Sequence, residues 1–196
     1  MDRAIRFPLA AAALALAFPA GTLVAAPSQA PYTVVETGQG FNSLQQAVNA
    51  IGSNKGTIEI APGVYADCAV QSAGTISYLA SVPGKAVFDG VTCEGKAALV
   101  LRGAGASVSG LVFENMRVPD ANGAGIRLEH GNLTVAQSWF RDSEEGILTA
   151  NDPNGLIVVD KSTFTRLGRC DRGLSCRFMG RSTICAATNC WLKVLG

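Results

Sequence analysis

Acidic and basic side chains recur in the second half of this chain at spacings that would bring them together. Arg141-Asp142 and Thr165-Arg166 occupy matching places in two successive repeats, and Glu144-Glu145 follows the first of them. A positioned carboxylate, or a base such as Arg or Lys, can move a proton to or from a substrate. From this raw material, which also includes Lys161 and Arg172, we predict four catalytic residues: Arg127, Asp142, Glu145 and Arg166.

A solvated face with ion pairs between neighbouring strands explains the same residues without any chemistry, so both interpretations stay open. The only histidine, His130, precedes a predicted turn, where a surface hydrogen-bonding role fits better than catalysis. Trp139 and Trp191 recur at a matching position of two repeats, where they would stack on sugar rings or pack against neighbouring strands.

The elements that must position these residues are short strands that return at intervals of roughly 21 to 28 residues. One series comprises 99–101, 125–128, 146–149 and 173–176, and a second comprises 112–115, 139–142, 163–166 and 191–194. Segments 133–135 and 156–158 lie between the two series. The ordered return of the same motifs favours an all-β solenoid over an antiparallel sandwich. In this register, Arg127 points outward from its strand.

An amphipathic helix is predicted before the repeats. Apolar residues at helical spacing run from Phe41 to Ile51, Asn42 or Ser43 can cap the start, and Gly52 follows the end. The alternating segment 57–60 then predicts a strand, and a Pro-Gly turn follows it. Because a parallel β-helix has an open end, we expect the helix to cover that end.

This opening segment resembles that of the pectin-lyase-like right-handed parallel β-helix proteins, which include pectin methylesterases and polysaccharide lyases. The resemblance extends over about 32–174, and the residues that carry it are Phe41, Ser43-Leu44-Gln45, Ala47-Val48, Gly56-Thr57-Ile58, Ala61-Pro62-Gly63-Val64-Tyr65, and the repeats at 110–115 and 125–160. It implies a right-handed single-stranded parallel β-helix with an N-terminal capping helix. It is specific for fold and not for activity.

For function, the resemblance implies an exported protein that acts on or binds an acidic polysaccharide. Lyase-type β-elimination uses a base beside a carboxylate that Ca²⁺ neutralises, so calcium is the cofactor to be tested, although the residues specify none. The strand motifs that serve pectin methylesterases are absent. Two alternatives remain open: a non-catalytic glycan-binding or structural module, and an inactive truncated fragment of a larger enzyme.

Six cysteines in a chain with an export signal suggest disulfides. Cys68 and Cys93 lie 25 residues apart, about one repeat, and we predict that they form a disulfide between adjacent strands. Two reduced, buried cysteines are the alternative. The four others, Cys170, Cys176, Cys185 and Cys190, lack the spacing of a familiar zinc site, and their pairing stays undetermined.

The N-terminus predicts export. Residues 1–26 combine Arg3 and Arg6, a short apolar run and a small-residue cleavage site, which is typical of a signal peptide. A secreted or periplasmic location follows, with no membrane span once the signal is removed. Loss of Asp2, Arg3 and Arg6 leaves the chain without net charge, so a general nucleic-acid binder is not expected.

The remaining boundaries divide the mature chain into an N-terminal extension at 27–40, the β-helix with its cap at 41–175, and a tail at 176–196. The tail is basic and Cys-rich, and it interrupts the repeat before the motif returns near Trp191. A divergent terminal cap and a truncated or frame-shifted reading frame both explain it, and we favour the second. The oligomeric state is left undetermined.

Overall fold

The computed structural model describes residues 30–150 and 155–168, together with the backbone of a strand at 192–194. The predicted signal peptide, the cysteines from Cys170 onward, Arg172 and Trp191 lie outside the described residues. Within them the regular structure consists of short strands and one helix, which confirms the prediction of an all-β protein.

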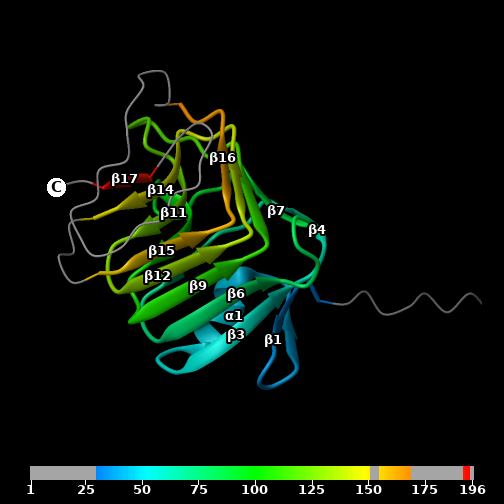
Figure 1. Ribbon diagram of the computed structural model, residues 1–196. Coiled ribbons are helices and arrows are strands. Elements are labelled where there is room, and N and C mark those ends of the chain that lie inside the picture. The colour runs from blue at the N-terminus through cyan, green and yellow to red at the C-terminus, as the bar shows by residue number, and fades with distance from the viewer. Residues whose placement is uncertain (1–29, 151–154, 169–191, 195–196) are drawn as a thin grey trace, which may run out of the picture.

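Three sheets are built from strands that alternate regularly along the chain (Figure 1). Sheet A contains, in spatial order, β15 (Ile157–Asp160), β12 (Asn132–Ala136), β9 (Gly105–Ser109), β6 (Thr75–Ala80), β3 (Lys55–Ile60), β1 (Tyr32–Val34) and β2 (Gln39–Phe41). Sheet B contains β16 (Thr163–Thr165), β13 (Trp139–Arg141), β10 (Leu111–Glu114), β7 (Ala86–Asp89) and β4 (Gly63–Tyr65). Sheet C contains β17 (Leu192–Val194), β14 (Glu145–Thr149), β11 (Ala124–Leu128), β8 (Ala97–Leu101) and β5 (Ala69–Gln71).

From β3 onward the chain visits sheets A, B and C in turn, and each strand pairs in parallel with the third strand after it. We call three successive strands, one from each sheet, a strand triplet. The register agrees with the predicted repeats: Val112 pairs with Trp139 in sheet B, and Leu99 pairs with Ile126 in sheet C. One placement was wrong. The segment 191–194 was expected in the series that forms sheet B, whereas β17 pairs with β14 of sheet C.

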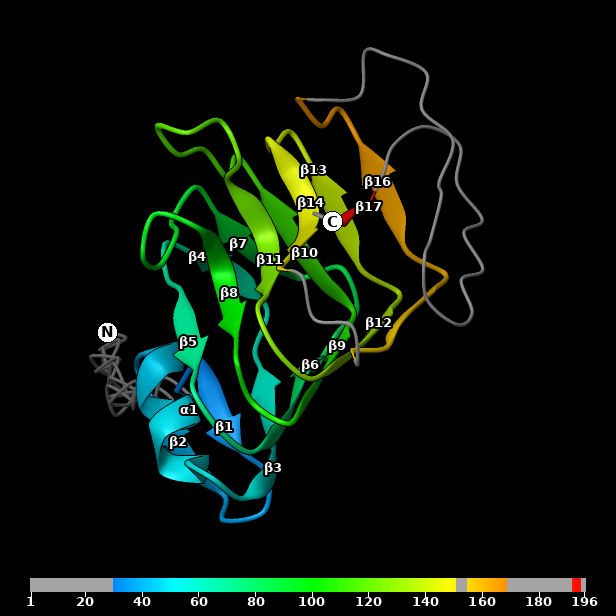
Figure 2. The same cartoon turned by 90° about the vertical axis from the view of Figure 1, so that its left-hand side faces the viewer.

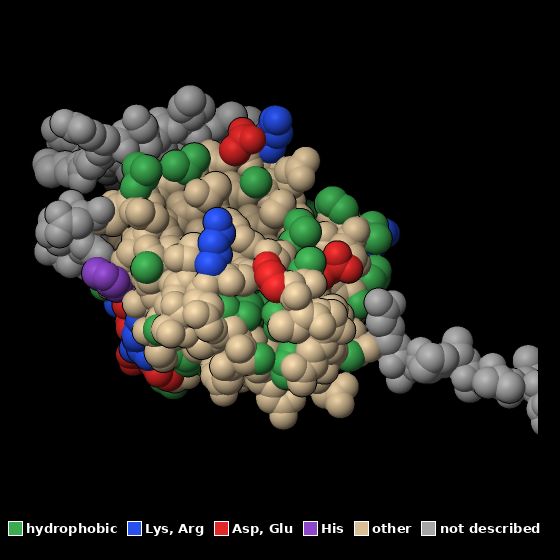
Figure 3. All heavy atoms as spheres, turned by 90° about the horizontal axis from the view of Figure 1, so that it is seen from below, with side chains coloured by type: hydrophobic (Ala, Val, Ile, Leu, Met, Phe, Trp, Pro, Cys, Tyr) green, Lys and Arg blue, Asp and Glu red, His purple; other side chains and the backbone are tan. Residues whose placement is uncertain are grey.

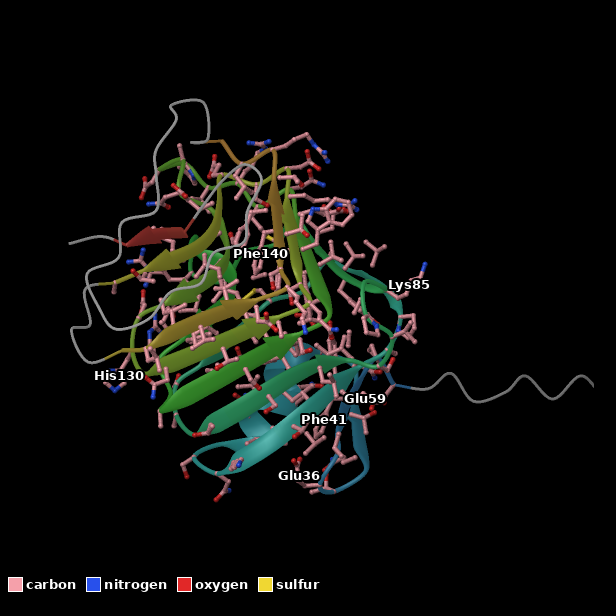
Figure 4. The ribbon with its side chains drawn as sticks, viewed as in Figure 1. Glu36, Phe41, Glu59, Lys85, His130 and Phe140 are labelled. Atoms are coloured by element: carbon pink, nitrogen blue, oxygen red, sulfur yellow. A yellow bond between two sulfur atoms is a disulfide. The ribbon has the colours of Figure 1, made fainter. Side chains whose placement is uncertain are left out.

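The inward side chains of the three sheets form one core. In sheet B the inward positions form an aromatic ladder of Tyr65, Phe88, Phe113, Phe140 and Phe164, with Tyr32 of β1 added at one end. Phe140 lies 5.1 Å from Phe113 and 4.8 Å from Phe164 between ring centroids, and Figure 4 shows it between the sheets. Because paired positions in successive strands face the same way, one aromatic residue in each triplet is enough to build the ladder.

Gly125 faces this ladder and leaves room for it. A Cβ added at Gly125 would lie 2.7 Å from Cδ1 of Phe140 and 2.8 Å from Cβ of Phe113. Gly146, in the next triplet, has the same relation to Phe164. The glycine that opens these sheet C motifs is therefore a packing requirement of the sheet B aromatic rings.

The helix α1 (Leu44–Ile51) lies at the end of the molecule where the first triplet begins (Figure 2). Leu44, Ala47, Val48 and Ile51 are its buried residues, and the Ser43 side chain accepts a hydrogen bond from the Gln46 N–H, as an N-cap should. The helix and the following strand β3 were predicted, and Ser43 was one of the two candidates for the N-cap.

Gln45 closes the edge of sheet C. Its side-chain Oε1 accepts a hydrogen bond of 2.7 Å from the Val70 N–H, and its Nε2 donates one of 3.1 Å to the Val70 carbonyl oxygen. The amide thus satisfies the N–H and the carbonyl oxygen of Val70, which a neighbouring strand would otherwise bind. Asp67 ties the same region together, since its carboxylate accepts from the N–H groups of Leu44 and Cys68.

A disulfide joins Cys68 to Cys93, as predicted, and links the first triplet to the second with a Cα–Cα distance of 5.5 Å. Cys93 and Val70 pack against a second, smaller apolar cluster on the outer face of sheet C, formed by Ala97, Val100, Ala124 and Leu148. The outer face of sheet C therefore includes a buried apolar area.

At the corner between sheets B and C, four successive triplets each have one residue in the left-handed backbone conformation. Gly90, Asn115, Asp142 and Arg166 have φ values of 67°, 59°, 53° and 51°, and each directly follows a strand of sheet B. Asn and Asp tolerate this conformation better than most residues, whereas Arg rarely adopts it. The corner therefore sets the backbone while leaving the side chain free to differ from one triplet to the next.

Candidate functional site

The outer face of sheet B contains a cluster around Trp139, which we call the sheet B cluster and which comprises Trp139, Arg141, Glu114 and Thr165. The Trp139 Nε1 donates a hydrogen bond of 2.8 Å to the Thr165 Oγ1. The Arg141 guanidinium lies 4.2 Å from the centre of the indole ring, and its Nε is 2.5 Å from the Glu114 Oε2. These contacts hold the indole ring and the guanidinium in fixed positions on the sheet surface.

Beside it, the B–C corner carries the predicted pair Asp142 and Arg166. The Arg166 Nε and Nη2 donate to the two carboxylate oxygens of Asp142 at 2.5 and 2.6 Å, a bidentate ion pair. Arg166 lowers the pKa of the Asp142 carboxyl, with smaller effects from Arg141 and Arg117. The Arg166 side chain remains 63% exposed, so its charge is open to solvent.

Arg127 lies elsewhere, on the outer face of sheet C. In register it sits between Val100 and Leu148, both buried, while its chain neighbours Ile126 and Leu128 belong to the core. The side chain therefore points outward, as predicted. Only 18% of it is exposed, and its nearest charge is the Glu129 Oε1, 3.6 Å from its Nε.

An ionic network of Glu94, Lys96, Arg102 and Glu129 adjoins this position through Glu129. Lys96 binds Glu129 at 2.8 Å and Glu94 at 3.1 Å, and Arg102 binds the same two carboxylates, the Glu129 contact measuring 2.6 Å. The bonds from Arg102 and Lys96 lower the pKa of Glu94 to about 2. Burial opposes the ionisation of Glu129, but the same two cations outweigh it and lower its pKa as well.

With Arg127 included, three cations and two carboxylates meet here among the residues that the structure describes, an excess of one positive charge within this group. Figure 3 shows blue and red side chains gathered below the histidine. That residue is His130, which follows Glu129 in the chain and projects from the margin of the molecule in Figure 4.

Glu145 differs from its predicted setting. We expected it in a turn with an outward cluster of acids, but it begins strand β14, pairs with Ala124 and is 5% exposed. Its neighbour Glu144 has a structural role, because its Oε2 accepts hydrogen bonds from the Val118 and Gly123 N–H groups at 3.0 and 2.7 Å. These bonds fix the loop that precedes β11.

The four predicted catalytic residues thus divide into two places. Asp142 and Arg166 form an ion pair at the B–C corner, whereas Arg127 and Glu145 belong to strands of sheet C. Lys161, the further basic candidate, is 74% exposed and lies 3.8 Å from Asp160. Trp191, the predicted counterpart of Trp139, lies outside the described residues, and the strand β17 that follows it pairs in sheet C.

Sequence reasoning missed the ionic network. Arg102 and Glu129 each directly follow a strand of sheet C, and the pairing of Leu101 with Leu128 places them at the same point of successive triplets. That coincidence in register was the available signal. Glu94 and Lys96 lie in the bend before β8, where no repeat predicts their direction.

The described residues offer calcium no cluster of carboxylates. Among the described residues, no three His, Cys, Asp or Glu side chains gather where they could hold a metal ion. Asp142, Glu114 and Glu94 are each bound to an arginine instead. In the same part of the chain, no helix has the length and apolar composition needed to cross a membrane.

Comparison with known proteins gave no match to this chain among family models, curated proteins or solved structures.

Proposed function

We propose that this chain forms a right-handed parallel β-helix that is exported and binds an acidic polysaccharide. This fold is supported by the order of the strands, which belong in turn to sheets A, B and C, and by the parallel pairing between successive triplets. Strands in such a stack lie about 4.8 Å apart, so each outward position forms a row along the molecule. Such rows suit an extended polymer better than a compact ligand.

The observation that carries the proposal is the recurrence of charged side chains in these rows. Arg141 follows Glu114 in register, Arg166 follows Asp142 at the next corner position, and Glu129 follows Arg102. Exposed cations beside a fixed indole ring offer a uronate chain both carboxylate contacts and a stacking surface. A neutral, non-repeating ligand would use neither the rows nor the charges.

Binding without cleavage is the form of this function that the geometry favours. The Asp142 carboxylate is bound to Arg166, Glu145 is buried, and Arg127 is not in the same cluster as either ion-pair partner. The four predicted catalytic residues therefore do not converge on one substrate position, where β-elimination would need a base beside the proton that it removes. Lyase activity is therefore the second candidate, carried by the family resemblance alone.

The test is titration of the purified chain with polygalacturonate and with a neutral galactan, followed by absorbance of unsaturated product with and without calcium. We expect binding of the acidic polymer only, weakened severalfold in Arg166→Gln. Lys85→Gln is the matched control, because Lys85 is exposed at the opposite end of the sheet B strands and points away from the cluster (Figure 4). Equal binding of both polymers would contradict the proposal, and turnover would establish the lyase.

A further inference from the structure

Arg127 has donors that the described structure does not use. A guanidinium presents five N–H donors, and within the described residues the ion-pair partner given for Arg127 is Glu129. Its Nε is buried without a partner, and the Glu129 oxygen at 3.6 Å is too far for a hydrogen bond. Each such group in a folded protein needs an explanation, and a missing ligand is one of them.

The surroundings of Arg127 make this cost larger. Val100 and Leu148, its register neighbours on either side, are 0% and 3% exposed, so the stem of the arginine is enclosed by apolar side chains. Burying a cation in such a setting is unfavourable unless an anion and hydrogen bonds compensate for it. An apolar residue of similar length would suit the packing better.

The neighbouring carboxylate of Glu129 compensates for this cation only in part. Glu129 accepts hydrogen bonds from Lys96 and Arg102 at 2.8 and 2.6 Å, whereas its ion pair with Arg127 is longer, at 3.6 Å. The group of five side chains therefore keeps one unbalanced positive charge, and Arg127 is the member with the fewest contacts.

We infer that Arg127 is an anion-binding residue on the outer face of sheet C and that its ligand is a carboxylate. A carboxylate matches the planar fork of the guanidinium, neutralises the single excess charge and fits the 18% of the side chain that reaches solvent. In the context of the proposed function, on which this part rests, the carboxylate belongs to a uronate residue of the polysaccharide.

The experiment compares the wild-type chain with Arg127→Met, which keeps the length of the side chain and removes its charge. Calorimetric titration uses a de-esterified oligogalacturonate and its fully methyl-esterified counterpart, with Lys85→Met as the control. We expect Arg127→Met to weaken binding of the de-esterified oligomer at least tenfold and Lys85→Met to leave it unchanged. Thermal unfolding provides the second readout: Arg127→Met should melt at the same or a higher temperature, since it removes a cation that lies among apolar neighbours and whose ion pair with Glu129 is long.

Three outcomes decide between the two proposals. Unchanged affinity in Arg127→Met overturns the inference and leaves the polysaccharide function in place. If the wild-type chain binds neither oligomer, the polysaccharide function fails, and the inference is decided by melting in sodium acetate against sodium chloride of equal ionic strength. Stabilisation by acetate that disappears in Arg127→Met then supports a carboxylate site, and the absence of stabilisation rejects it.

Discussion

At the scale of the residue, the side chain of Gln45 makes the pair of hydrogen bonds that the backbone of a neighbouring strand usually makes. Its amide has the same donor and acceptor as a peptide group, and it binds both the N–H and the carbonyl oxygen of Val70 at the first strand of sheet C. A glutamine within an amphipathic helix can therefore complete a sheet edge without another strand.

We predict that Gln45→Ala lowers the free energy of unfolding by about 1–3 kcal/mol, because two backbone groups of Val70 lose their partners. Urea denaturation measures the change. Gln46→Ala is the matched control: the same substitution one position later, at an exposed side chain, should change stability by less than about 0.5 kcal/mol. Equal effects of the two substitutions would contradict the role assigned to Gln45.

A second prediction concerns Glu94 and acid. Its pKa falls from 4.5 to about 2 in the folded chain, so the ionised form stabilises the fold above pH 4.5. This contribution is lost as the pH falls from 4.5 toward 2, where the folded protein also takes up the proton. Because the group is exposed, the effect is modest and decreases with added salt.

The melting temperature of Glu94→Gln should therefore decline less steeply between these pH values than that of the wild-type chain. Glu59→Gln is the control, since Glu59 lies on the outer face of sheet A and makes no ion pair within the described residues. Parallel pH profiles for Glu94→Gln and the wild type would show that the contacts with Lys96 and Arg102 do not operate in solution.

At the scale of the element, the sheets B and C depend on each other through glycine and aromatic residues. Gly125 of β11 has no room for a methyl group because Phe140 of β13 and Phe113 of β10 occupy the space. The constraint is steric and not conformational, since Gly125 is not among the residues with positive φ.

We predict that Gly125→Ala destabilises the protein by about 1–3 kcal/mol through overpacking. Phe140→Leu alone should also destabilise it, but the double variant should be more stable than the sum of the two effects allows, because the smaller leucine makes room for the added methyl group. A double-mutant cycle by urea denaturation measures this coupling. Additive effects would show that the contact between Gly125 and Phe140 is not the source of the strain.

At the scale of the whole molecule, each triplet contacts mainly its neighbours, so distant changes should act independently. We predict that Gln45→Ala and Phe140→Leu add to within about 0.5 kcal/mol, because α1 packs against β1, β2, β3 and β5 and not against β13. Denaturation of the double variant tests this. A coupling as large as that expected for Gly125 and Phe140 would mean that the stack transmits strain over its full length.

The sequence predicts much of this architecture because the same type of residue returns at the same position of each repeat. Phe113, Phe140 and Phe164 return in the same setting, and their register follows directly from that return. The helix and its capping serine follow from local rules of spacing and hydrogen bonding. These features need no knowledge of which strands are neighbours beyond the repeat itself.

The candidate site could be predicted only in part. The pairing of Asp142 with Arg166 follows from the repeat, because both residues occupy the same corner position in successive triplets. The burial of Glu145 and the network of Glu94 and Lys96 depend on how the bends between strands are directed, and bends vary in length from one triplet to the next. A short sequence repeat therefore predicts the positions of the strands better than the course of the segments that join them.

The left-handed corner after sheet B has a consequence for how this molecule can vary. Four successive triplets place Gly, Asn, Asp and Arg at that corner with nearly the same backbone conformation. The fold thus offers one outward side chain in each triplet whose identity the core does not determine. These positions form a column with the spacing of the strands, so the charges along it can change from triplet to triplet without altering the interior, most easily among the residues that tolerate a left-handed backbone.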